Sequence, residues 1–134
     1  MPRTPRVEYE NAVYHVMARG NHREAIVFDD GDRELFYDTF AEVCGRTGWE
    51  VFAWVLMDNH YHALFRTPEP NLVAGMQWFQ NTFTRRLNTR RHLWGHLYGG
   101  RYKAIPIEDA ATSPRGSVVW RDYLRTVIDY VHLN

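Results

Sequence analysis

Two histidines separated by one residue are the side chains best placed by type and spacing to do chemistry. His60 and His62 lie in the stretch 54–66, in which apolar runs flank the dipeptide Asp58-Asn59. Because such a dipeptide can take the positive φ angles of tight turns, we predict a β-hairpin whose second strand carries both histidines. Side chains alternate between the two faces of a strand, so both imidazoles share one face and Tyr61 takes the other. Two neutral imidazoles this close could bind a divalent metal ion.

Such a pair is also compatible with two histidines on a half-hydrated sheet face, because a metal site needs further protein ligands or water. The last predicted helix offers a ligand, since Tyr130 and Asn134 are four residues apart and lie on one helical face. If that face meets the histidines, Asn134 can give an amide oxygen to the metal and Tyr130 a phenol beside it. A phenol attacks phosphate once a divalent cation polarises the phosphate. The alternative for Tyr130 is an ordinary aromatic residue of an amphipathic helix.

Charge is segregated along the chain although the formal net charge is zero. Residues 1–70 hold 7 Lys and Arg against 12 Asp and Glu, whereas residues 71–134 hold 9 against 4. This asymmetry indicates that one surface meets a polyanion. The end of the second predicted helix is strongly basic, with Arg85, Arg86, Arg90 and Arg91. Basic residues also suit a helix C-terminus electrostatically, so DNA binding and a structural role are equally compatible with this cluster.

The totals predict one domain over residues 1–134. Cys44 is the single cysteine and cannot form an internal disulfide. There is no membrane-length apolar run and no secretory signal at the N-terminus, so we expect a cytoplasmic protein without membrane partners. If its basic half binds DNA, the protein would be associated with the nucleoid. No glycine-rich phosphate loop is present, which argues against a nucleotide cofactor.

Hydrophobic periodicity and turn residues predict seven elements that would position these side chains. They are a strand over 12–19, a helix over 32–46, the hairpin over 50–67, a helix that follows the capping residue Asn71 and extends through Leu87, a strand over 102–108, and a helix from Val118 or Trp120. Pro106 suggests an edge position for its strand. The order β-α-β-β-α-β-α predicts an α+β, ferredoxin-like sandwich, in which an antiparallel sheet has helices packed on one face and the histidines lie on a central strand.

The ordered motifs resemble those of a known family. They are Ala12-Val13-Tyr14-His15-Val16, Arg19-Gly20-Asn21, the run from Val55 to His62, Gly100-Arg101-Tyr102-Lys103-Ala104, and Tyr130-Val131-His132-Leu133-Asn134. Together they resemble the REP-associated tyrosine transposases, which are relatives of the small insertion-sequence transposases within the HUH endonucleases. The similarity covers about residues 5–108 and 121–134.

The resemblance implies a role for each matching position. His60, His62 and Asn134 would hold Mg²⁺ or Mn²⁺, and Tyr130 would be the nucleophile. The implied activity is cleavage of single-stranded DNA near hairpins, which leaves a 5′-phosphotyrosine and a free 3′-OH. The implied DNA-facing residues are Arg85, Arg86, Arg90, Arg91, Arg101 and Lys103.

Two departures from the family pattern keep alternatives open. Residues 109–121, with Pro114 and Gly116, lengthen the connection before the last helix, and the sequence ends at Asn134 where the family usually continues. One alternative is therefore a catalytically impaired protein that binds hairpin DNA. Another is a small metal-dependent hydrolase, for which the hairpin offers Asp58 but no clear set of catalytic acids and bases. A monomer is favoured over a homodimer.

Overall fold

The computed structural model describes residues 8–107 as a four-stranded sheet with two long helices. The elements are β1 (Ala12–Arg19), the short 3-10 helix η1 (Asn21–Arg23), α1 (Asp30–Thr47), β2 (Glu50–Leu56), β3 (His60–Thr67), α2 (Leu72–Arg91) and β4 (Lys103–Pro106). The predicted last helix, with Tyr130 and Asn134, lies outside the described residues, as does part of the predicted domain 1–134.

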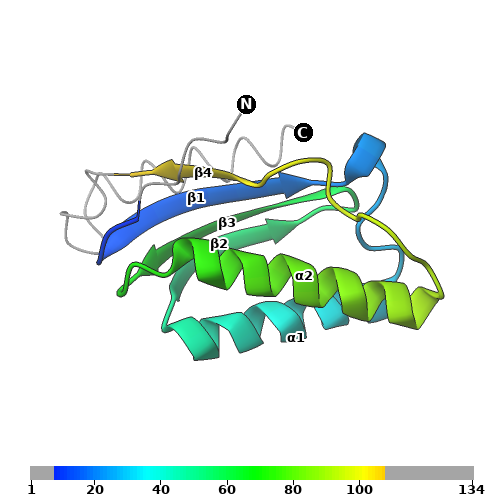
Figure 1. Cartoon of the computed structure of the whole chain (residues 1–134), viewed down its shortest axis with the longest axis horizontal. Helices are drawn as coiled ribbons and strands as arrows, with labels where there is room; N and C mark the ends of the chain where they lie inside the picture. Colours follow the sequence, from blue (N-terminus) through cyan, green and yellow to red (C-terminus); the bar gives the residue numbers. More distant parts are fainter. Residues whose placement is uncertain (1–7, 108–134) are drawn as a thin grey trace.

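The strands lie in the order β2-β3-β1-β4, and all three strand pairs are antiparallel. Figure 1 shows α1 and α2 side by side on one face of this sheet. The α+β, ferredoxin-like prediction is confirmed, including the position of the histidines on the internal strand β3. Because β3 pairs on both sides, its backbone is fixed along its whole length.

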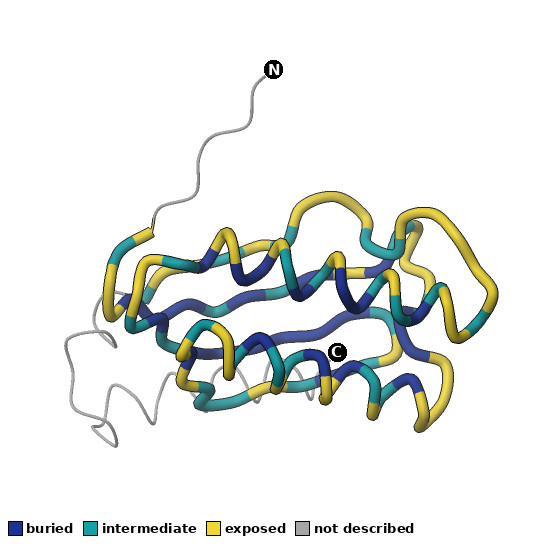
Figure 2. Tube along the Cα trace, turned by 60° about the horizontal axis from the view of Figure 1, so that its bottom comes forward, coloured by how far each residue is buried: buried dark blue, intermediate teal, exposed yellow. Residues whose placement is uncertain are grey.

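The core fills the space between the sheet and the helices. Alternation along β1 directs Ala12, Tyr14, Val16 and Ala18 into this core, as expected for a strand with one face against helices. The helices contribute large apolar side chains, including Phe36, Leu72, Met76, Phe79 and Phe83, all of which are buried. Figure 2 shows that buried segments follow the strands and the inner sides of both helices.

Local details differ from the predictions. Helix α1 begins at Asp30, earlier than predicted, because Asp29 is its N-cap and accepts a hydrogen bond from the Asp32 amide. Asn71 does stand at the N-cap of α2, but its side chain makes no cap bond. Instead, Asn71 accepts from Trp49 Nε1 at 2.8 Å and donates to the Thr47 carbonyl at 3.0 Å, which joins the end of α1 to the start of α2.

The predicted hairpin and edge strand are both present. The turn between β2 and β3 does not use positive φ, since among described non-glycine residues only Asn11, His22, Arg23 and His92 have it. β4 is shorter than predicted and lies at the sheet edge, as Pro106 indicated. Neither long helix of the described region is apolar enough to cross a membrane.

Candidate active site

Two of the three predicted metal ligands, His60 and His62, lie on the sheet face that α1 and α2 leave uncovered, which we call the histidine face. His60 and His62 project from β3 to this face, and only 8% and 2% of their surfaces are exposed. Their ring centroids are 5.2 Å apart and the rings are nearly perpendicular. Tyr61 points to the opposite face, where its hydroxyl accepts a hydrogen bond from Gln80 Nε2 at 2.9 Å. The strand alternation predicted from sequence therefore places the two imidazoles together.

The protonation of His60 can be derived from its neighbour in the turn. Nδ1 of His60 lies 2.8 Å from Oδ1 of Asn59, while the Asn59 amide nitrogen donates to the carbonyl of Arg23 at 3.3 Å. An amide oxygen only accepts, so in the neutral ring the proton is on Nδ1 and the lone pair is on Nε2. Nε2 is consequently the nitrogen with which His60 would bind a metal.

A third imidazole, which the sequence did not mark as functional, contacts this pair. Nε2 of His15 on β1 lies 3.0 Å from Nδ1 of His62. The contact uses Nδ1 of His62, so a metal bound by His62 would be held through Nε2. Outer partners of this kind fix the tautomer and orientation of metal-binding histidines. Alternation along β1 placed His15 on one face, but the register between β1 and β3 was needed to bring it to His62.

Burial keeps these histidines neutral. Burial, followed by the nearby His15, His60 and Arg19, lowers the pKa of His62 to about 4. The pKa of His60 is lowered by burial and then by Arg19, and that of His15 is lowered by burial. Neutral imidazoles have the lone pairs that metal binding requires.

Two cations share the histidine face. Arg19 is the strand partner of His60, and Lys103 on β4 is the partner of Met17, which is itself the partner of His62. Directly paired residues of a sheet project to the same face. Lys103 was predicted to face DNA, whereas Arg19 was not. Arg19 lies four residues after His15 on β1, so strand alternation alone would have placed both on the same face. The histidine face thus combines two candidate metal ligands with charges that suit a phosphate backbone.

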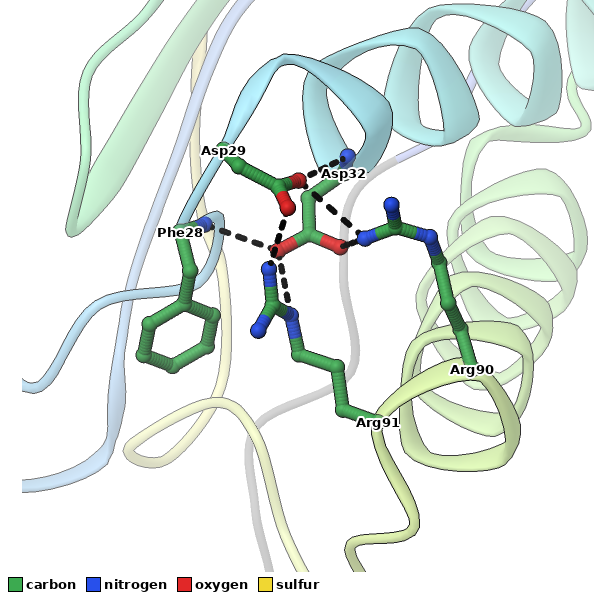
Figure 3. A network of polar contacts seen from close by, with 5 residues as sticks. All are labelled: Phe28, Asp29, Asp32, Arg90 and Arg91. Atoms are coloured by element: carbon green, nitrogen blue, oxygen red, sulfur yellow. Dashed lines mark hydrogen bonds and ion pairs between the residues drawn. The ribbon is translucent and has the colours of Figure 1, made fainter.

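The predicted basic cluster at the end of α2 is tied into the fold. Arg90 and Arg91 both contact Asp29 and Asp32 at the start of α1, in what we call the Asp–Arg network (Figure 3). Arg91 Nε donates to the completely buried Asp32 carboxylate at 2.6 Å, and the Phe28 amide also donates to it at 2.9 Å. The network locks the end of α2 to the start of α1.

The remaining predicted DNA-facing residues lie elsewhere. Arg86 donates to Glu42 at 2.8 Å and to Thr39 at 3.2 Å. Arg85 lines a cleft between α2 and the loop that follows it, and Arg101 is exposed at the end of that loop. The structure therefore does not gather the six residues on one surface, and their DNA contacts stay predictions.

Comparison with known families identifies the lineage. The family model described as "Transposase IS200 like" matches residues 8–133. The chain belongs to this family. The match confirms the transposase resemblance drawn from the motifs. Among proteins with curated descriptions, none matches the chain significantly.

Two solved structures share the fold of this IS200-like transposase. One is a REP-associated tyrosine transposase bound to a REP hairpin, with a TM-score of 0.69 and 15% identity over 92% of this chain and 68% of the other. The second is a protein of Deinococcus radiodurans R1, provisionally described as a transposase, with a TM-score of 0.59 and 18% identity over 97% of both chains. At these identities the likeness establishes the fold.

The histidine face of this IS200-like transposase fits part of a divalent metal site. Two neutral imidazoles suit such an ion, and both Nδ1 atoms are oriented by neighbours. Within residues 8–107, no group of three His, Cys, Asp or Glu side chains could hold a metal ion. Further ligands would therefore be water, an amide or a residue outside that range. Asn134 was predicted to be such a ligand.

Proposed function

We propose that this chain is a metal-dependent, single-stranded DNA endonuclease and strand transferase that acts at hairpin sequences. The observation that carries the proposal is the pair His60 and His62, oriented side by side on the histidine face of an IS200-like transposase. The structural neighbour bound to a REP hairpin supports hairpin DNA as the substrate class. The match to residues 8–133 also includes Tyr130, the proposed nucleophile.

The proposed ligands for Mg²⁺ or Mn²⁺ are Nε2 of His60, Nε2 of His62 and the amide oxygen of Asn134. When bound, the metal would polarise the scissile phosphate and neutralise developing charge. His15 acts as a positioning residue in this proposal. With its own proton on Nδ1, it accepts from Nδ1–H of His62 and so keeps the lone pair of His62 on Nε2.

In the proposed reaction, the oxygen of Tyr130 bonds to phosphorus while the bond from phosphorus to the 3′ oxygen breaks. The products are a 5′-phosphotyrosine on the protein and a free 3′-OH on the DNA. Because the phosphodiester energy is conserved in the protein–DNA bond, a 3′-OH can reverse the step and join strands without ATP. Arg19 and Lys103, which lie on the histidine face, would hold flanking phosphates.

A denaturing-gel assay tests this proposal. The protein is mixed with labelled single-stranded hairpin oligonucleotides, taken from repeats beside its own gene, in Mg²⁺, Mn²⁺ or EDTA. We expect a slowly migrating, protease-sensitive adduct that requires metal and is abolished in Tyr130→Phe. An adduct of undiminished yield in Tyr130→Phe would exclude this residue as the nucleophile.

The same samples separate the two alternatives. A shift on a native gel without any adduct would indicate a hairpin-binding protein that does not cleave. Turnover of a small phosphate ester that survives Tyr130→Phe but requires His60 and His62 would instead indicate a metal-dependent hydrolase.

A further inference from the structure

A polar cleft lies between α2 and the loop of residues 92–100, which follows α2 in Figure 1; we call it the loop cleft. Its volume is about 580 Å³, within the range of small-ligand sites. Asn81, Arg85 and Asn88 line its α2 side, while Trp94 and His96 line its loop side. No Asp or Glu is among the described residues that line it. The loop cleft therefore suits a neutral or anionic polar ligand better than a cationic one.

The loop is held at several points. The Leu93 amide donates to the Asn88 carbonyl at 2.9 Å, and the Asn88 side chain donates to the Gly95 carbonyl at 3.2 Å. Further along, the Asn21 amide donates to the Leu97 carbonyl at 2.8 Å. A loop fixed in this way loses little conformational entropy when it binds a ligand.

The fixed loop nevertheless presents a large aromatic side chain to solvent. Trp94 is 93% exposed, the most exposed large hydrophobic side chain among the described residues, and the adjacent Leu93 is also exposed. An indole so exposed is typical of a binding surface when its loop is ordered. Its flat face can stack on any nucleobase, and the guanidinium of Arg85 can pair with a phosphate.

Backbone contacts connect the loop cleft to the end of β3 that carries the histidines. The Gly99 amide donates to the Arg19 carbonyl at 3.0 Å, and the Gly20 amide donates to the Asn59 carbonyl at 2.8 Å. Arg19 is the strand partner of His60. A DNA strand at the histidine face would therefore have a short path around this end of the sheet to the loop cleft.

We propose that the loop cleft binds one unpaired nucleotide of the DNA substrate, with its base stacked on Trp94 and its phosphate paired with Arg85. This inference rests on the proposed function for the identity of the substrate, but it concerns a binding site separate from the cleavage centre. Asn81 supplies an amide that can hydrogen-bond to a base edge.

Binding in EDTA tests the proposal without cleavage. Fluorescence anisotropy is measured with a labelled hairpin that has single-stranded flanks and with the same hairpin fully paired and blunt. We expect Trp94→Leu to weaken binding of the flanked hairpin about tenfold, because one base stack is lost, and to leave the blunt hairpin unchanged. Trp94→Phe keeps a stacking face and should retain most of the affinity. Because Trp94 is exposed, both variants should melt as the wild type does.

Photo-crosslinking identifies the contact directly. Flanked hairpins with a single 5-iodouracil at successive flank positions are irradiated, and crosslinked peptides are sequenced. We expect one position to crosslink at Trp94. Equal loss for flanked and blunt hairpins would show that Trp94 contacts paired DNA, and unchanged affinity in Trp94→Leu would show that Trp94 contacts no DNA; either result would overturn the proposal. If the wild-type protein forms no adduct through Tyr130 but Trp94→Leu still weakens binding of the flanked hairpin, the proposed cleavage would be refuted and the proposal for the loop cleft would stand.

Discussion

Two polar clusters of this protein use their hydrogen-bonding groups in opposite ways. The Asp–Arg network joins carboxylates to guanidinium groups between the start of α1 and the end of α2. The histidine face brings together His15, His60 and His62 without any described carboxylate in hydrogen-bonding contact. Opposite charges that satisfy one another in the fold stabilise it. Neutral imidazoles carry lone pairs that can bind a metal ion, so the histidine face is better suited to binding a ligand than to stabilising the fold.

The comparison changes the interpretation of the basic α2 terminus. From sequence, Arg90 and Arg91 were candidates for DNA contact, whereas in the structure both neutralise Asp29 and Asp32. Arg19 and Lys103 lie instead on the histidine face. A cluster of cations in the sequence therefore does not identify a DNA surface until the positions of the acids are known.

Asp32→Asn should have the largest effect, since it leaves two guanidinium groups around a buried neutral amide. We expect a loss of about 2–4 kcal/mol in the free energy of unfolding, somewhat less than the roughly 3–5 kcal/mol for fully buried pairs, because both arginines are partly exposed. Urea denaturation measures it. Asp30→Asn, on the same turn but exposed, is the matched control and should change stability by less than about 0.5 kcal/mol. Equal stabilities of the two variants would show that the network is not structural.

His15→Leu should weaken metal binding rather than folding. Without an acceptor at Nδ1 of His62, the tautomer and orientation of that ring are no longer fixed, so we expect Mn²⁺ affinity to fall about 10–100-fold. Mn²⁺ titration followed by electron paramagnetic resonance measures the affinity without DNA. His15→Gln should recover most of it, because an amide oxygen can accept the same hydrogen bond. Affinities in the Leu variant that match those of the Gln variant would contradict the positioning role.

The metal-free protein should lose stability in mild acid because His62, on the histidine face, resists protonation in the folded state. The pKa of His62 is about 4 in the fold against 6.5 ordinarily, so between these values the unfolded chain binds a proton that the folded chain does not. Stability should therefore fall as pH decreases from about 6.5, by about 1 kcal/mol at one pH unit below. Urea denaturation in EDTA across this range measures the slope. His62→Gln should flatten this slope. An unchanged slope would show that the pH dependence of stability does not come from His62.

Lys103→Gln should have the smallest effect, and it should change the affinity for DNA without changing the stability of the fold. Removal of one phosphate contact should weaken binding a few fold in low salt and lower the salt-dependence slope by about one. Lys103→Arg keeps the charge and serves as the control, and Arg91→Gln should reduce stability instead. Anisotropy with hairpin DNA at several salt concentrations compares them. A larger salt effect in Arg91→Gln than in Lys103→Gln would reverse the assignment of these two cations.

The sequence by itself determined the fold class, the hairpin, the edge position of β4 and the shared face of His60 and His62. These features depend on period-two alternation, helical periodicity and turn residues, which act over a few neighbouring positions. The start of α1 was predicted two residues too late, at Asp32 instead of Asp30. Asn71 proved to bond Trp49 rather than the helix end, because a side-chain partner distant in sequence competes with local capping.

Only the tertiary structure decided which groups meet across elements. The register of β1 against β3 brings His15 to His62, and the packing of α1 against α2 joins Asp32 to Arg90 and Arg91. The course of the loop after α2 places Trp94 and Arg85 in the lining of the same cleft. Such pairs lie tens of residues apart, and their side-chain types alone do not specify which contact forms. Alternation along one strand brought the two candidate ligands, His60 and His62, to one face, and long-range packing determined which residues surround them.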